Sequence, residues 1–128
     1  MSYSQEALDI ESRLTTGWTT TSIVFGNGPF IPTPGTAWIR CTILPGSASA
    51  LSFGRDTDIE YDGIIDIGVF VPKDTGDMTI LGYIDTLVTL FNMQKFGTVD
   101  CDEAVALNLG ESDGWYHHSI TIPYSRIE

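Results

Sequence analysis

The chain has 128 residues, of which 42% are hydrophobic and 18% charged, and this length favours a single domain over residues 1–128. The hydrophobic content supplies a core and excludes a disordered chain. The formal net charge of −11 disfavours sequence-specific binding to nucleic acids and binding to anionic membranes, because phosphate groups repel acidic side chains.

The N-terminal sequence "MSYSQEALDIESR" lacks the basic patch and the apolar run of a signal peptide. No apolar stretch approaches the ~20 residues that span a membrane. We therefore expect a cytoplasmic location, with Cys41 and Cys101 both reduced.

The first quarter of the chain predicts a helix and then a strand. Residues 3–16 predict the helix, because one face carries apolar residues at spacings of four, three and four: Tyr3, Ala7, Ile10 and Leu14. Residues 19–26, "TTTSIVFG", are rich in β-formers and predict the first strand.

A stiff apolar arm, "GPFIPTPG", follows at residues 28–35. Phe30 and Ile31 lie between Pro29 and Pro32, and proline fixes an extended backbone that loses little entropy on docking. Two alternatives remain at this point. The arm folds back over its own core, or it docks on a neighbouring subunit or partner.

Three β segments are expected next. Residues 37–44 predict a strand whose core face carries Ala37, Ile39, Cys41 and Ile43. Pro45-Gly46 predicts a turn, and residues 48–54 predict a short, weaker strand. Residues 59–72 give the strongest strand signal, since apolar residues alternate there with Glu60, Asp62 and Asp66.

The remainder predicts one helix and two strands. Residues 78–92 predict a helix with Asp77 as its N-cap and a broad apolar stripe. Strands are expected at 104–109 and at 115–123. The order predicts an α+β domain, a mostly antiparallel sheet with two main helices packed on one face.

The sequence contains no catalytic or ligand-binding motif that points to a specific chemistry. His117 and His118 are strand neighbours that point to opposite faces, so they cannot share one metal ion. The acidic run "DCDE" at 100–103 lacks the spacing of a calcium loop, and the acidic residues of 58–66 are expected on the wet face of a strand. We therefore predict no catalytic residue, no metal and no cofactor.

Several segments together resemble a known family. They are the first helix ending in "RL", then "GNGPFIPTPGTAWIRCTILPG", "YDGIIDIGVFVPKDTG", "YIDTLVTLF" and "GWYHHSITIPYSR". Their order and spacing are similar to those of the tail terminator, or tail completion, proteins of long non-contractile-tailed bacteriophages. The resemblance runs through most of the chain.

The resemblance implies a structural protein of the virion tail, assembled in the host cytoplasm, and not an enzyme. Such proteins form a ring, typically a hexamer, that caps the tail tube and ends its polymerisation. The implied partners are other copies of the chain, the tail tube protein and the head–neck connector. DNA passes through the channel without specific binding, and no membrane is involved.

The resemblance also directs attention to two segments as interface candidates. The arm would supply lateral or tube contacts through Phe30, Ile31, Pro32 and Pro34. The loop around Arg55 and Asp56 would supply an axial or lumen contact. The alternatives are a head–tail joining protein or tube subunit, a monomeric adaptor, and a small hydrolase or ligand-binding domain that uses His118 and the acidic strand face.

Overall fold

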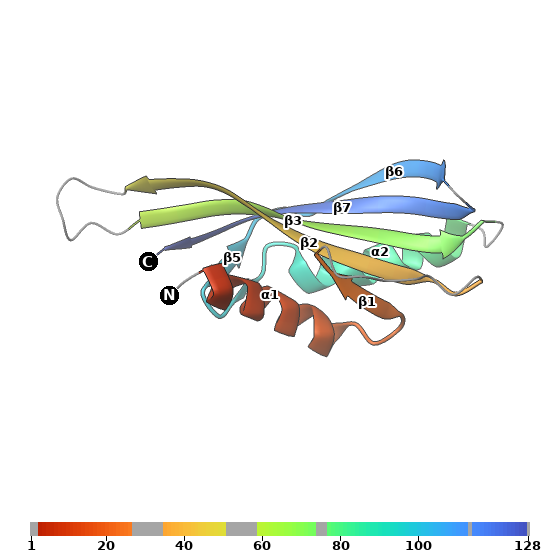
Figure 1. Ribbon diagram of the computed structural model, residues 1–128, viewed down its shortest axis with the longest axis horizontal. Coiled ribbons are helices and arrows are strands. Elements are labelled where there is room, and N and C mark those ends of the chain that lie inside the picture. Colours follow the sequence, from red (N-terminus) through yellow and green to blue (C-terminus); the bar gives the residue numbers. More distant parts are fainter. Residues whose placement is uncertain (1–2, 27–34, 51–58, 74–76, 113, 128) are drawn as a thin grey trace.

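The computed structural model describes residues 3–26, 35–50, 59–73, 77–112 and 114–127 (Figure 1). Two long helices and seven strands follow in this order: α1 (Tyr3–Gly17), β1 (Ser22–Phe25), β2 (Trp38–Ala50), β3 (Ile59–Pro72), α2 (Asp77–Phe91), β4 (Lys95–Phe96), β5 (Val99–Cys101), β6 (Val105–Ser112) and β7 (Trp115–Ile127).

The seven strands form one mixed sheet in the order β1-β2-β3-β7-β5-β4, with β6 also paired to β7. The β1–β2 pair is parallel, whereas β2–β3, β3–β7, β5–β7, β4–β5 and β6–β7 are antiparallel. Strand β7 therefore pairs with β3 along one side and with β6 and then β5 along the other. With two helices beside this sheet, the architecture is α+β, as predicted.

Both helices contribute to one hydrophobic core with alternate residues of β2, β3 and β7. The residues of α1 that are fully buried in this core are Ile10 and Leu14, and α2 supplies Ile80, Ile84, Leu87 and Phe91. The helical apolar spacing predicted for 3–16 and 78–92 is confirmed to within one residue at each boundary. Figure 1 shows both helices below the sheet as it is drawn, with the start of α1 near the end of β7.

The turn predicted at Pro45-Gly46 is wrong. Strand β2 continues through this dipeptide to Ala50, and its register against β3 shifts between Pro45 and Ala48. A bulge of this kind absorbs extra residues while the pairing continues on both sides. Long-range pairing with β3 therefore overrides the local turn preference. Residues 48–50 of the separate strand expected at 48–54 are the end of β2, and residues 51–54 lie outside the described residues.

Strand β7 continues past Pro123, where the prediction had ended it. The carbonyl oxygen of Pro123 accepts a hydrogen bond from the backbone N–H of Asp102, 2.8 Å away and on the side opposite β3. In an antiparallel strand the N–H of a residue points to the same side as its carbonyl group. The N–H that proline lacks would therefore point away from β3, so Pro123 removes no hydrogen bond from the β3–β7 ladder.

Candidate interaction surfaces

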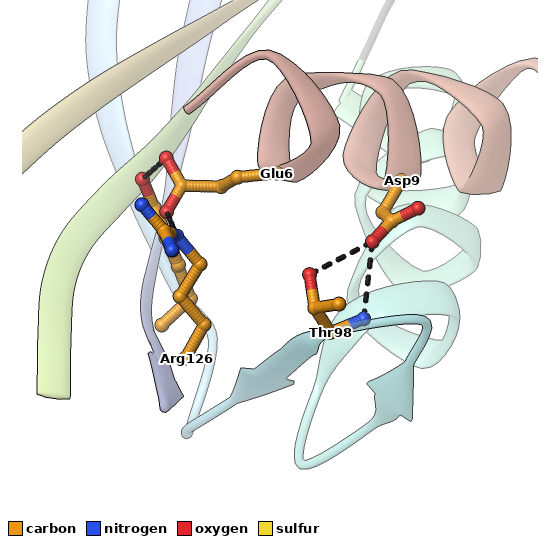
Figure 2. A network of polar contacts seen from close by, with 5 residues as sticks. Glu6, Asp9, Thr98 and Arg126 are labelled. Atoms are coloured by element: carbon orange, nitrogen blue, oxygen red, sulfur yellow. Dashed lines mark hydrogen bonds and ion pairs between the residues drawn. The ribbon is translucent and has the colours of Figure 1, made fainter. Parts of the chain in front are cut away.

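A buried ion pair fixes the start of α1 to the end of β7. The Nε atom of Arg126 donates a hydrogen bond to Oε1 of Glu6 at 2.8 Å, and the Tyr124 hydroxyl donates to Oε2 at 2.7 Å. The side chains of Glu6 and Arg126 are each 2% exposed. Figure 2 shows Glu6 reaching from the helix toward Arg126. Because a buried charge needs a partner, this pair specifies where the helix lies.

Two tyrosine rings extend this contact on the guanidinium side. The Cζ atom of Arg126 lies 4.2 Å from the ring centre of Tyr61 and 5.0 Å from that of Tyr3. Burial and the bond to the Glu6 carboxylate raise the pKa of Tyr124, so its hydroxyl stays a proton donor. The cluster joins α1, β3 and β7 in one polar contact.

A second polar contact holds the β4–β5 hairpin against α1. The Asp9 Oδ2 atom accepts hydrogen bonds from the Thr98 backbone N–H at 3.0 Å and from its hydroxyl at 2.9 Å (Figure 2). Burial alone would raise the pKa of Asp9, but the hydrogen bonds from Thr98 and Gln5 outweigh it and lower the pKa.

Arg13, one turn further along α1, anchors the last turn of α2. Its Nε and Nη2 atoms donate to the carbonyl oxygen of Leu90 at 3.1 and 3.0 Å. Carbonyls in a last helical turn lack partners within the helix, so a guanidinium satisfies one of them. The N-terminal helix therefore binds three different elements through side chains.

Two shallow hollows flank the hairpin. One, of about 390 Å³, lies between α1 and α2 and is lined in part by Asp9, Arg13 and Phe96. The other, of about 270 Å³, lies beside β7 and is lined in part by Lys95 and Asp100. In the first hollow Asp9 and Arg13 are already engaged with Thr98 and Leu90, which suits a structural role better than acid–base chemistry.

The two histidines and Asp66 of the sheet make structural contacts. His118 is 7% exposed and its ring stacks on Tyr116, whereas His117 stacks on Phe70 with ring centres 4.1 Å apart. Burial lowers the pKa of His117. Asp66 accepts a hydrogen bond from the Ser119 hydroxyl at 2.5 Å. Among the described residues, no group of three or more His, Cys, Asp or Glu side chains could hold a metal ion.

Both cysteines are free and buried. Burial, with the acidic residues nearby, raises the pKa of each thiol to about 12. The thiolate is the reactive form, so Cys41 and Cys101 are poor nucleophiles near neutral pH.

The sheet face away from the core carries exposed apolar side chains. In the register, Val105 lies opposite Thr121 and Leu107 opposite Ser119, whereas Ala106 lies opposite the buried Ile120. Alternation along β6 therefore directs Val105 and Leu107 away from the core, and each is 60% exposed. Leu44 and Ile64, which are cross-strand partners, are 50% and 40% exposed on the same side.

The residues singled out from the sequence as interface candidates lie outside the described residues: Phe30, Ile31, Pro32, Pro34, Arg55 and Asp56. Sequence analysis missed the Glu6–Arg126 pair. The signal was present, because the inward alternation of Ile120 and Ile122 continues to Tyr124 and Arg126. The assumption that Pro123 ended the strand hid it.

Comparison with known proteins supplies the family. A family model described as phage tail terminator protein matches residues 7–124. The chain belongs to the phage tail terminator family. The match includes most of α1, the whole sheet except the end of β7, and the exposed apolar residues of β6. The resemblance noted in the sequence is confirmed at the level of this family.

A tail terminator is a structural tail protein, so the family places the chain in the phage tail. One similar solved structure, whose printed name states no function, is 17% identical with a TM-score of 0.75. The alignment covers 100% of this chain and 96% of that chain, which shows a shared fold. A search of curated proteins found no match. No helix in the described ranges is long and apolar enough to cross a membrane.

Proposed function

We propose that the protein forms a ring, most simply a hexamer, that caps the finished tail tube of a phage with a long non-contractile tail. The ring ends addition of tube subunits and offers a surface to the head–neck connector. The observation that supports this proposal is the tail terminator match over residues 7–124. On this proposal the protein is not an enzyme, and it acts in the virion after assembly in the host cytoplasm.

The proposed mechanism is geometric. Each subunit needs two different lateral patches, because a closed ring is built from head-to-tail contacts. A further face matches the tube end, and the opposite face does not, so polymerisation stops there. The net charge of −11 suits a channel through which DNA slides, since an acidic lumen does not hold phosphate groups.

The arm and the 55–56 loop are proposed as contacts of this ring. Phe30 and Ile31, stiffened by Pro29, Pro32 and Pro34, would bind a neighbouring subunit or the tube. Arg55 and Asp56 would face the axis or lumen.

The proposal is tested by adding the purified protein to growing tail tubes. Electron microscopy should show rings on tube ends, and the length distribution of the tubes should stop advancing. A protein that leaves tube growth unchanged and binds no tube end would refute the terminator role. Binding to an isolated neck complex without any effect on tubes would favour the head–tail joining alternative.

Phe30→Ala tests the arm within this framework. We expect the variant to lose the ring while its melting temperature stays that of the parent, because the contact is made between subunits. Sedimentation velocity and thermal unfolding measure the two quantities. The arm assignment is wrong if the ring stays intact at unchanged stability. A lowered melting temperature would show that the arm packs on its own subunit.

A further inference from the structure

Three edge strands end the sheet in the part of the chain that the structure describes: β1, β6 and β4, of which β4 has only two residues and carries Lys95. Strand β1 ends the sheet on one side and pairs only with β2. Strand β6 pairs with β7 and has no second partner strand. An open edge presents unpaired N–H and C=O groups, and proteins usually protect such edges with charged residues or proline.

Strand β1 and the regular part of β6 lack the usual protection by charge, and the one charged residue of β6, Glu111, lies beyond the register shift. The β6 segment 104–110, "AVALNLG", contains no charged residue and no proline. Its Val105 and Leu107 are each 60% exposed, and Leu109 is 50% exposed. Strand β1 lies within residues 14–39, in which no aspartate, glutamate, lysine or arginine occurs.

This distribution is informative because the whole chain is strongly acidic. Two copies with a net charge of −11 each repel one another over most of their surfaces. They can approach closely where both partners are uncharged, and the two uncharged edges lie on different sides of the sheet. That is the arrangement that a head-to-tail interface requires.

The lengths of the two edges also agree. Strand β1 comprises four residues, Ser22–Phe25. The regular part of β6 comprises Val105 to Asn108, after which the register shifts before Gly110. The Asn108 side chain accepts a hydrogen bond from the Gly110 backbone N–H at 2.8 Å, which ends the flat part of the edge.

We infer that the open edge of β6 pairs with the open edge of β1 in a second copy of the chain, so that the sheets of neighbouring subunits join. Main-chain hydrogen bonds would hold the pair, and Val105 and Leu107 would be covered by the neighbour. This inference rests on the proposed ring and names the lateral contact within it.

Leu107→Lys tests the β6 edge, because a lysine on an edge opposes pairing with another strand. The matched control is Leu8→Lys, which places the same charge at a 57% exposed leucine on α1. We expect Leu107→Lys to abolish ring formation on tubes while circular dichroism and melting temperature stay unchanged. Leu8→Lys should assemble as the parent does. Rings formed equally by both variants would overturn the inference.

Cysteine cross-linking distinguishes failure of this inference from failure of the ring. Ser22→Cys is combined in turn with Val105→Cys and with Leu107→Cys, since parallel and antiparallel pairing bring Ser22 toward opposite ends of the segment. The native thiols of Cys41 and Cys101 are buried, so we expect them to form no disulfides under mild oxidation. A ladder of disulfide-linked multimers in one combination supports the pairing. Rings that are visible by microscopy but give no cross-links refute the β6–β1 pairing without contradicting the terminator role. Absence of any ring in the parent refutes both.

Discussion

At the scale of single residues, the Glu6–Arg126 pair decides how the helical layer meets the sheet. Both side chains are almost fully buried, and Glu6 also accepts the Tyr124 hydroxyl. Such a pair adds little net stability compared with apolar side chains. Removal of one partner, however, leaves the other charge buried without compensation. Its main contribution is therefore to specify the position of α1.

Glu6→Gln should destabilise the protein by about 3–5 kcal/mol, because Arg126 would then be buried without a counter-charge. Urea unfolding measures the change. Glu103→Gln, at an exposed position, is the control and should change stability by less than about 0.5 kcal/mol. The double variant Glu6→Leu/Arg126→Leu should recover part of the loss. A single variant as stable as the control would show that the pair does not specify the packing of α1.

At the scale of elements, the β4–β5 hairpin depends on α1 for its position. The hairpin strands have two and three residues, which is too short to hold an orientation unaided. Asp9 binds Thr98 at its tip through two hydrogen bonds. Gly97, next to Thr98, has a left-handed backbone with φ +54°, which favours glycine, and a Cβ atom at this position would lie only 2.5 Å from Oδ2 of Asp9.

Asp9→Ala should lower stability at neutral pH by about 1–2 kcal/mol, since Thr98 loses a charged acceptor. Asp85→Ala, on the exposed side of α2, is the matched control. Because the folded-state pKa of Asp9 is lowered, its contribution is present above the unfolded value of 3.8 and is lost as pH falls through the folded pKa. The difference between parent and variant should therefore shrink below pH 3.8 in acid unfolding curves. A difference that stays constant across that range would contradict the assignment.

Much of the fold at this scale could be predicted from the sequence. Strand 59–72 and both helices follow from strong periodicity, and their predicted ranges agree with the structure. Strands β4 and β5 were not predicted, because two or three residues give no periodic signal. The turn predicted at Pro45-Gly46 was wrong, because the pairing of β2 with β3 outweighs the local turn preference of this dipeptide. The interface residues proposed at 30–34 and 55–56 stay predictions.

At the scale of the whole molecule, charge and assembly are linked. With a net charge of −11 per chain, each added subunit increases the repulsion within the proposed ring. The contacts that we propose between the sheet edges are uncharged, so salt should weaken the repulsion and leave the attraction in place.

Ring formation should therefore strengthen between 0.05 and 0.5 M NaCl, as the Debye length falls toward about 3 Å at high salt. Sedimentation velocity across this series gives the oligomer fraction, with sucrose at matched osmolality as the control. Dissociation with rising salt would mean that ion pairs hold the subunits together, contrary to the proposed uncharged contact.

The contact between the first helix and the last strand has a consequence for synthesis on the ribosome. Glu6 and Arg126 are 120 positions apart in the sequence, yet the start of α1 lies beside the end of β7 (Figure 1). A nascent chain exposes α1 first, but the partner of Glu6 is translated almost last. The core that buries Ile10 and Leu14 therefore lacks the residues of β7 until translation is nearly complete. Completion of the fold is thereby coupled to completion of the chain. A product truncated before Arg126 would lack the partner with which the Glu6 carboxylate is buried.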